Sequence, residues 1–311
     1  MKAPLLASID IGSNSVLLLV GRIIDGKLHT ELQRKETIRL GGALDSAGNL
    51  LPSAMERGLE CLRRYAGLIA HISPTHRRVV ATQTLREARN REAFLQQAQA
   101  ILGCPVELIS GEREAALIYQ GVSSLLPPST ERRLVVDIGG RSTEICIGQG
   151  SHLEAAVSCP IGSVAWAQRF FGDGILNAER FAAANADAQA LLQTHMAPLS
   201  HATWEHVFGS SGTAGAISKA LHQAGYPAGE ITRPTLFQLQ QQLIHAGHID
   251  RLPLQGLREE LRPVIGGGVS VMCAVFDMFK LQHMRIAQGA LRHGVLFDLH
   301  ASLQYRGEPS A

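Results

Sequence analysis

The chain has 311 residues, more than one compact hydrophobic core usually holds, so we expect two domains. Its composition, 45% hydrophobic and 18% charged, is that of an ordinary globular protein and excludes the disordered and fibrous classes. The net charge is +2, and the basic residues are scattered along the sequence without the clustered stripe of a nucleic-acid-binding protein. We therefore expect no nucleic-acid partner, and local groups must hold any anionic ligand.

Three features predict a cytoplasmic protein with no stable membrane association. The five cysteines are odd in number and none has CxxC spacing, which favours a reducing compartment over a disulfide framework or zinc site. An aspartate occurs within the first ten residues, which leaves no room for a signal-peptide core. The longest apolar run, 264–279, is interrupted by glycines and an aspartate and predicts a buried core helix.

In chain order, the first half predicts three strands followed by alternating helices and strands. Buried strands over 5–9 and 16–24 flank a turn, and a third strand over 27–38 follows the Asp25-Gly26 hairpin signal. Helical spacing of apolar residues and the breaks between them then predict a helix over 53–71, a strand over 78–81, a helix over 85–102, a strand over 106–109 and a helix capped by Ser110. The alternation is that of an α/β domain.

The second half repeats this order after an expected hinge at 125–130. We expect strands over 134–138, 144–148, 152–158, 206–209 and 285–287, and helices over 164–171, 177–196, 210–222, 234–246, 258–279 and 290–299. Both halves begin with the order βββαβα, which predicts two similar domains facing each other across a cleft, domain I at 1–125 and domain II at 126–311. As an alternative for the end of the chain, a C-terminal helix over about 299–311 packs back on domain I.

Two hairpin turns share an aspartate, a glycine and hydroxyl residues. In the first turn, Asp10 ends a strand, where it can hold a metal through water, and Gly12 allows close backbone approach. The side chains of Ser13, Asn14 and Ser15 supply donors, so the turn suits phosphate oxygens. An ordinary hairpin would explain one copy alone. The second copy, DIGGRSTE at 137–144, and the later GSSGT at 209–213 favour a phosphate-binding constellation.

Two charged residues are candidates for catalysis and binding. Glu114 lies just inside a predicted helix on a partly apolar side, where desolvation would suit a general base. The alternative is that Glu114 only complements the helix dipole. Arg86 lies between a strand end and a helix, where it can clamp a phosphate, or form an ordinary surface salt bridge.

At these residues the sequence resembles the exopolyphosphatase/guanosine pentaphosphate phosphohydrolase (Ppx/GppA) family, in a short two-domain form. The resemblance runs nearly end to end and is carried by ASIDIGSNS at 7–15, ATQTLREARN at 81–90, ISGEREAALIYQGV at 109–122, VVDIGGRSTE at 135–144, FGSSGTAGAI at 208–217 and IAQGALRHGVLFD at 286–298. It implies an α/β fold of two actin-like (ribonuclease H-like) domains, as in the superfamily of actin, sugar kinases and heat-shock ATPases.

The resemblance also implies roles for these residues. Glu114 would activate the attacking water and Arg86 would grip the substrate. The phosphates would be bound by Gly12, Ser13, Asn14, Ser15, Gly139, Gly140, Arg141, Ser142, Thr143, Ser211, Gly212 and Thr213. Magnesium would be held by Asp10, Asp137 and Glu144, with K⁺ as an activating monovalent cation. A homodimer is the expected assembly.

The implied activity is that of an exopolyphosphatase, a phosphoric-anhydride hydrolase that releases orthophosphate processively from the end of inorganic polyphosphate. One alternative is hydrolysis of the 5′ γ-phosphate of guanosine pentaphosphate (pppGpp). Another is a catalytically weak protein that binds polyphosphate or the alarmone. Arg113 and Arg141 motivate this last hypothesis, because they replace an acidic residue and a glycine of the family pattern and add positive charge.

Overall fold

The structure, a computed structural model, describes residues 3–200, 202–252 and 259–305. The chain folds as two compact units, one made of 1–128 with 289–311 and the other of 129–288. The expected domain II ran to the C-terminus, whereas the segment from Gly289 belongs to the first unit. Its helix, α10 (Leu291–Tyr305), starts earlier than the expected 299–311, of which residues 306–311 lie outside the described part.

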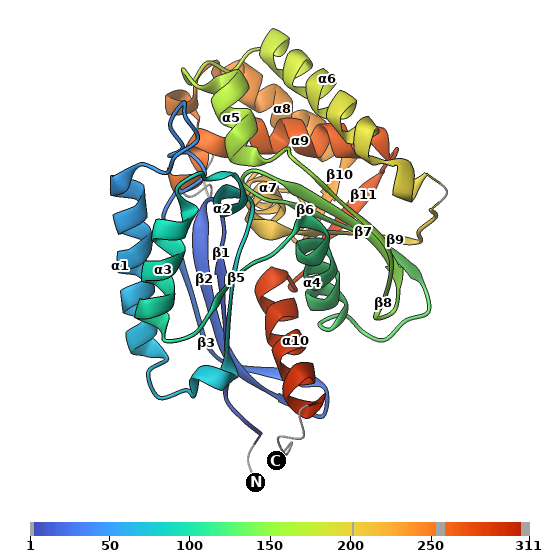
Figure 1. The fold of residues 1–311 in the computed structure, drawn as a ribbon. Helices are drawn as coiled ribbons and strands as arrows, with labels where there is room; N and C mark the ends of the chain where they lie inside the picture. The colour runs from blue at the N-terminus through green and yellow to red at the C-terminus, as the bar shows by residue number, and fades with distance from the viewer. Residues whose placement is uncertain (1–2, 201, 253–258, 306–311) are drawn as a thin grey trace. The chain divides into compact units, whose positions relative to one another are not determined.

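The first unit is built on a five-stranded sheet with the order β3-β2-β1-β4-β5 (Figure 1). The strands are β1 (Leu6–Ile11), β2 (Ser15–Ile24), β3 (Lys27–Thr37), β4 (Arg77–Ala81) and β5 (Val106–Leu108). β1 pairs antiparallel with β2 and parallel with β4. Besides α10, the helices are α1 (Pro52–Leu68), the 3₁₀ turn η1 (Pro74–His76), α2 (Gln83–Glu87), α3 (Arg91–Leu102) and α4 (Gly111–Ser123).

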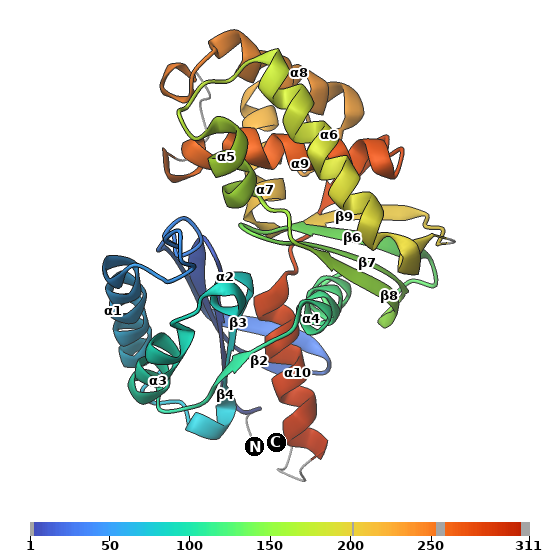
Figure 2. The ribbon, with the colours of Figure 1, turned by 45° about the horizontal axis from the view of Figure 1, so that its top comes forward.

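Strand β1 contributes to two different layers. Ala7, Ile9 and Ile11 join the hydrophobic core that includes residues of α1 and α3, whereas Leu6 packs with leucines of α10. Figures 1 and 2 show α1 and α3 along one face of the sheet and α10 and α4 side by side on the other. Because side chains alternate along a strand, Asp10 lies on the same face as Leu6, the face of α4 and α10.

Helices α4 and α10 approach closely through glycines. A Cβ atom on Gly121 of α4 would lie 2.3 Å from the carbonyl oxygen of Ala290, and one on Gly294 of α10 would lie 1.8 Å from that of Leu117. Both distances are too short for any side chain. The absence of Cβ atoms therefore sets the spacing of the helix that carries Glu114.

The second unit has a six-stranded sheet with the order β10-β11-β9-β6-β7-β8. The strands are β6 (Arg132–Ile138), β7 (Thr143–Gln149), β8 (His152–Cys159), β9 (His206–Ser210), β10 (Glu230–Thr232) and β11 (His283–Ile286). The helices are α5 (Ser163–Phe171), α6 (Ala178–His195), α7 (Ser211–Gln223), α8 (Arg233–Ala246) and α9 (Ile265–Met278), with short 3₁₀ turns η2 (Ala197–Leu199), η3 (Ile249–Arg251) and η4 (Glu259–Val264).

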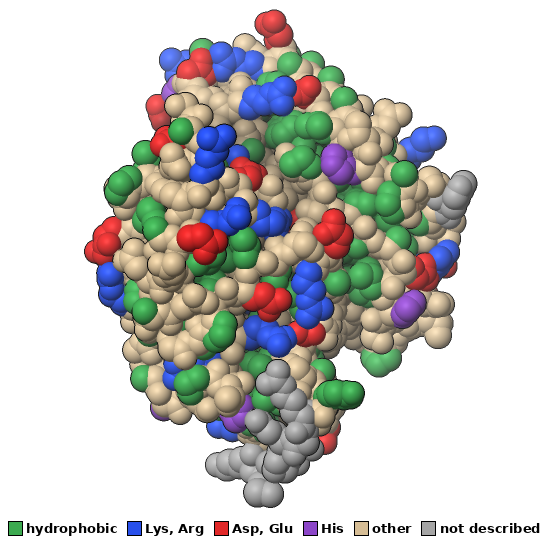
Figure 3. Space-filling model, viewed as in Figure 1, with side chains coloured by type: hydrophobic (Ala, Val, Ile, Leu, Met, Phe, Trp, Pro, Cys, Tyr) green, Lys and Arg blue, Asp and Glu red, His purple; other side chains and the backbone are tan. Residues whose placement is uncertain are grey.

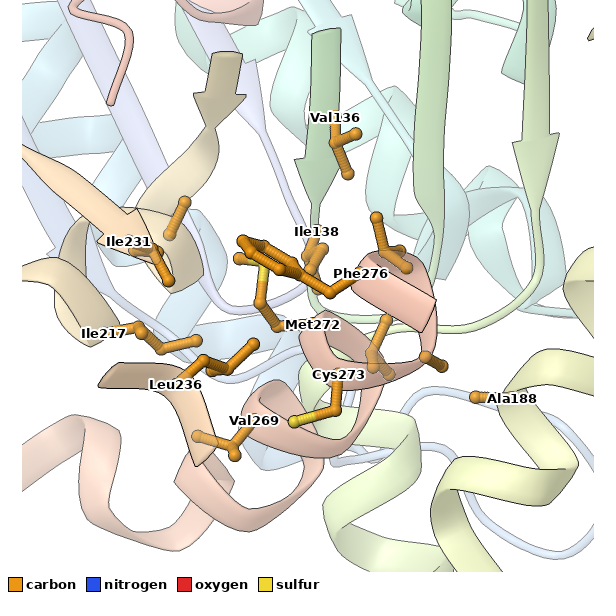
Figure 4. Close-up of a cluster of buried hydrophobic side chains, with 14 of the residues drawn as sticks. Val136, Ile138, Ala188, Ile217, Ile231, Leu236, Val269, Met272, Cys273 and Phe276 are labelled. Carbon is orange, nitrogen blue, oxygen red and sulfur yellow. The ribbon is translucent and has the colours of Figure 1, made fainter. Parts of the chain in front are cut away.

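Helix α9 lies at the centre of the second core. Met272 and Phe276 pack toward Val136 and Ile138 of β6, with side chains of α7 and α8 around them (Figure 4). The stretch Leu261–Met278 is apolar and long enough for a membrane span, but 72% of it is buried inside the protein, as in a core helix. Since Val136 and Ile138 face this core, the intervening Asp137 faces the opposite side of the sheet.

The elements depart from the sequence-based prediction at a few places. The helix predicted over 85–102 is two helices, α2 and α3, separated at Ala88–Asn90. The helix predicted over 258–279 is the 3₁₀ turn η4 followed by α9, with Pro263 inside the turn, and residue 258 lies outside the described part. The short edge strand β10 was not predicted.

On the face shown in Figure 3, acidic and basic side chains are interspersed.

Candidate active site

The predicted base and the predicted arginine form an ion pair in the first unit. Arg86, in the last turn of α2, donates from Nη1 to Glu114 Oε2 at 2.8 Å. Their side chains are only 18% and 8% exposed. A pair this buried is weakly screened by solvent, so the two charges strongly determine each other's position. The interpretation of Arg86 as an ordinary surface salt bridge does not describe this geometry.

Two further acceptors fix the plane of the Arg86 guanidinium. Nη1 also donates to the carbonyl oxygen of Ile109 at 2.8 Å, and Nε and Nη2 donate to Gln83 Oε1 at 2.9 and 2.6 Å. The Gln83 amide in turn donates to Glu87 Oε1 at 2.7 Å. Since arginine offers only donors, the amide oxygen of Gln83 must face it. Gln83 was not predicted as a site residue, although its position three residues before Arg86 on a helix is a usable signal.

Glu114 differs from the other acidic residue of the same helical turn. Ser110 caps α4 by accepting a hydrogen bond from the Arg113 amide, and Glu112 is exposed there. Hydrogen bonds from its own backbone amide and from Ser110 lower the pKa of Glu112, as expected for a carboxylate at a helix N-terminus. Glu114 instead is buried against Arg86. The helix-dipole interpretation therefore fits Glu112 better than Glu114.

The first hairpin turn joins β1 to β2 close to Asp10. The Gly12 amide donates to the Ser15 carbonyl at 3.1 Å, and a Cβ on Gly12 would lie 3.1 Å from that oxygen. Gly12 therefore closes the turn, rather than offering its amide to a ligand. The Ser13 and Ser15 side chains are buried and that of Asn14 is half-buried.

The second turn, between β6 and β7, has the same construction. The Gly139 amide donates to the Ser142 carbonyl at 2.9 Å, and a Cβ on Gly139 would lie 3.0 Å from that oxygen. The carbonyl of Gly140 accepts from the first amides of α5 at 2.8 and 3.1 Å. Thr143 is fully buried and donates to the Ile161 carbonyl at 2.7 Å, so it anchors the turn and is not placed to contact a ligand.

Two buried carboxylates lie opposite each other behind this second turn. Asp137 of β6 is the register partner of Glu144 of β7, and directly paired antiparallel residues project from the same face. Ser158 of β8 continues the row and donates to Glu144 Oε1 at 2.8 Å, and Ser210 of β9 pairs with Asp137 on the other side. Ser158 is a second residue of the candidate site that was not predicted from the sequence. Burial and these two carboxylates raise the pKa of the neighbouring Cys146 thiol, which makes it unreactive.

The third predicted loop opens helix α7. Ser211 has a φ of +84°, which is unusual for a residue with a side chain. Its hydroxyl oxygen accepts from the amides of Thr213 and Ala214 at 3.2 and 3.3 Å. Gly212 is exposed and Thr213 half-buried in the first helical turn.

The two arginines that depart from the family pattern have different surroundings. Arg113 Nη2 lies 2.7 Å from Asp298 Oδ2 on α10, and Arg78 of β4 pairs with the same carboxylate. Arg113 is therefore held at α10 by a carboxylate that it shares with Arg78, and the three groups together keep one net positive charge. Arg141 is half-buried in the β6–β7 turn, and a Cβ on Gly162 would lie 2.4 Å from its amide nitrogen.

The three predicted magnesium ligands belong to different units, Asp10 to the first and the pair Asp137 and Glu144 to the second. Across the described ranges, no three His, Cys, Asp or Glu side chains gather as a metal site would require. The pair remains suitable by chemistry, because Mg²⁺ prefers oxygen ligands and commonly uses one or two carboxylates with water and substrate phosphates.

Comparison with known proteins places these features in a family. The sequence model of the Ppx/GppA phosphatase family matches residues 19–303. A protein of Vibrio vulnificus named guanosine-5′-triphosphate,3′-diphosphate pyrophosphatase is 40% identical over 302 residues, which cover 97% of this chain and 60% of that protein. The chain thus spans about 60% of the length of the curated relatives it matches.

Solved structures support the same grouping. The Ppx/GppA enzyme of Aquifex aeolicus is 26% identical and has a TM-score of 0.78, covering 96% of this chain and 100% of that one. An exopolyphosphatase of Cytophaga hutchinsonii has a TM-score of 0.84 at 23% identity, covering 96% of this chain and 98% of that one, and so shares the fold. The two units therefore have the α/β, actin-like fold expected from the sequence. With its family motifs and nearly its whole length matched, the chain belongs to the Ppx/GppA phosphatase family.

Proposed function

We propose that this chain hydrolyses the terminal phosphoanhydride bond of inorganic polyphosphate and releases orthophosphate. The observation that carries the proposal is the buried pair of Glu114 and Arg86, in which a carboxylate is held 2.8 Å from an arginine nitrogen within a Ppx/GppA family chain. A buried carboxylate suits proton transfer, and an arginine suits a phosphate. Family membership supports the substrate class.

In the proposed reaction a water oxygen attacks the terminal phosphorus in line with the bridging oxygen. The new P–O bond forms as the bridging P–O bond breaks, and its electron pair leaves with the shortened polyphosphate. Glu114 accepts the proton of the water. Arg86, fixed by Gln83 and Ile109, keeps Glu114 oriented and offers positive charge to the terminal phosphate.

The hydroxyl and amide groups of the two turns orient the substrate in this proposal. Ser13 and Asn14 of the first turn, and Ser142 of the second, are the side chains that suit phosphate oxygens. Asp137 and Glu144 would hold magnesium, which when bound offsets the negative charge that develops on the phosphate oxygens.

A second substrate is favoured by one observation. The relatives at 40% identity are named for guanosine-5′-triphosphate,3′-diphosphate, which carries a comparable terminal phosphoanhydride. The same groups would act on either molecule, so guanosine pentaphosphate is the second candidate. The binding-protein hypothesis loses part of its motivation, because Arg113 is paired with Asp298.

The test measures orthophosphate release from long-chain polyphosphate and from guanosine pentaphosphate with Mg²⁺, for wild type and Glu114→Gln. The amide keeps an acceptor for Arg86 but removes the base, so turnover should fall roughly 10²–10⁴-fold while polyphosphate binding persists. Glu112→Gln, an exposed change in the same turn, is the matched control and should retain activity. Release by Glu114→Gln at the wild-type rate would rule out this base.

A further inference from the structure

A strained arginine lies beside the first hairpin turn. Among the described residues, four non-glycine residues have positive φ: Asp25, Arg39, Ser211 and Lys280. Asp25 belongs to the β2–β3 hairpin, where positive φ is usual, and Lys280 follows the end of α9, where it is also common. Ser211 lies at the start of α7, in the third predicted phosphate-binding loop. Arg39, with a φ of +53°, has neither ordinary explanation.

The loop that follows β3 is tied to the phosphate turn by its backbone. The amides of Ile38 and Arg39 donate to the Asn14 carbonyl at 2.9 and 3.0 Å, and the Gly41 amide donates to the Ser13 carbonyl at 2.7 Å. Arg57 of α1 supports the loop from outside by donating to the Ile38 carbonyl at 3.3–3.4 Å. The left-handed conformation at Arg39 turns the chain so that these bonds can form together.

A glycine at position 39 would adopt the left-handed conformation of this loop with less strain. A left-handed conformation brings the Cβ atom of a residue too close to its own backbone, a penalty that glycine avoids because it has no Cβ. Such strain gathers at functional sites, where the side chain is needed despite it. The backbone bonds explain the shape of the loop but not the presence of an arginine, so the reason lies in the guanidinium.

The guanidinium is available to a ligand. Arg39 is exposed, and within the described part of the chain its side chain forms no hydrogen bond or ion pair. Most other arginines of the first unit are engaged, for example Arg64 with Glu36 and Arg86 with Glu114. Its backbone amide is hydrogen-bonded to Asn14, so an extended arginine side chain is long enough to reach an anion held at the Ser13–Asn14 turn.

We infer that Arg39 is a binding residue for the phosphate groups of a linear polyanion seated at the Ser13–Asn14 turn. It binds through charge-assisted hydrogen bonds to phosphate oxygens, and the strained loop holds it in place. This inference rests on the proposed function for the polyphosphate class of the ligand and for its place at the Ser13–Asn14 turn. It predicts an effect on affinity, not on the chemical step, because Glu114 and Arg86 are left unchanged.

The test separates binding from turnover. Binding of tripolyphosphate and of long-chain polyphosphate to the full chain is measured by calorimetry with a chelator present, so that no hydrolysis occurs. Arg39→Gln should weaken binding about tenfold and reduce its salt dependence, as expected for the loss of one charged hydrogen-bonding partner. In steady-state assays KM should rise by a similar factor with kcat nearly unchanged.

A second variant tests the strain itself. Arg39→Gly should weaken binding as Arg39→Gln does, yet it should raise the melting temperature by about 1–3 °C because the left-handed conformation no longer strains the chain. A residue with a purely structural role would show the opposite, a lower melting temperature. Lys280→Gly is the strain control, with the same relief and no loss of binding, and Arg34→Gln is the exposed charge control.

The outcomes distinguish this inference from the proposed function. Phosphate release with no effect of either Arg39 variant on affinity would overturn the inference and leave the proposed function standing. Absence of release from any substrate, with tight binding that Arg39→Gln weakens, would overturn the proposed function and support the inference. Wild-type protein that binds neither polyanion would overturn the inference.

Discussion

At the scale of single residues, Gln83 is the unexpected partner in the candidate site. Its amide oxygen accepts from two nitrogens of Arg86, while its amide nitrogen donates to Glu87. It therefore fixes the side of the guanidinium that Glu114 does not contact. Without this acceptor, Arg86 would still attract Glu114 but would no longer present it in one orientation.

Replacement of Gln83 by methionine tests this positioning role. The change keeps the length of the side chain and removes both polar groups, so we expect kcat for phosphate release to fall about tenfold, as misplacement of a catalytic group costs rate. The melting temperature should change little, because α2 is short and Gln83 is partly exposed. Gln97→Met, an exposed change on α3, is the control, and equal kcat in the two variants would contradict the role.

The sequence identified the charged residues of the site better than their partners. Glu114 and Arg86 could be named as candidates from a capped helix and a strand end, and the resemblance to the Ppx/GppA family supplied their expected roles. Their pairing could not, since they are 28 positions apart and meet only through the tertiary fold. The same holds for Ser158, whose contact with Glu144 depends on the register of β7 with β8.

At the scale of elements, the contact of α4 with α10 is the least tolerant feature near Glu114. Gly294→Ala would place a Cβ 1.8 Å from the Leu117 carbonyl, so the helices would have to separate. We expect a loss of about 1–3 kcal/mol in the free energy of unfolding, the usual cost of overpacking, together with lower activity.

A second glycine provides the matched control for this measurement by chemical denaturation. Gly67 lies in α1, and a Cβ there would meet no atom within 4 Å. Gly67→Ala should stabilise the protein by roughly 0.5–1 kcal/mol, because alanine favours a helix over glycine. If Gly294→Ala and Gly67→Ala changed the free energy of unfolding by similar amounts, the glycine contact between α4 and α10 would not control the spacing of these helices.

Most elements could be predicted from periodicity, and the exceptions have local causes. The break between α2 and α3 was missed because apolar residues continue at helical spacing across Ala88, whose side chain is buried in the same core. The edge strand β10 has three residues, too few for a pattern of alternation. Each exception adds one element to its half, and the elements that were predicted keep their order.

At the scale of the whole molecule, the sequence could not predict which of the two units α10 belongs to. Order along the chain favours the second half, because α10 follows β11 directly. In the structure, Leu296 and Leu299 of α10 complete a small core with Leu6 and Leu19, and the Ser8 hydroxyl donates to the Arg292 carbonyl at 2.8 Å. The first unit is therefore discontinuous in sequence.

This discontinuity gives the first unit a titratable group at the start of its last helix. His293 is 5% exposed, and its Nδ1 accepts a hydrogen bond from the Ala290 amide at 3.0 Å, which requires an unprotonated Nδ1. Burial, and to a lesser extent Arg292, lowers the pKa of His293 from 6.5 to about 3. Below pH 6.5 the unfolded chain therefore binds a proton that the folded chain does not, and unfolding becomes more favourable as the pH falls toward 3.

As the pH falls from 6.5 toward 3, we expect His293 to lower the free energy of unfolding of the first unit by up to about 1.4 kcal/mol per pH unit. Above pH 6.5, His293 should leave this free energy unchanged. His293→Gln should flatten the dependence between pH 6 and 4, whereas the exposed change His71→Gln should not. Hydrogen exchange of α10 follows the first unit, while fluorescence of Trp166 and Trp204, the two tryptophans of the chain, follows the second. If acid reduced the hydrogen-exchange protection of α10 equally in wild type and in His293→Gln, other groups would be responsible for the pH dependence. If His293 is responsible, acid should reduce protection of α10 before the tryptophan signal changes, because the titrating ring is a buried side chain of α10, which belongs to the first unit.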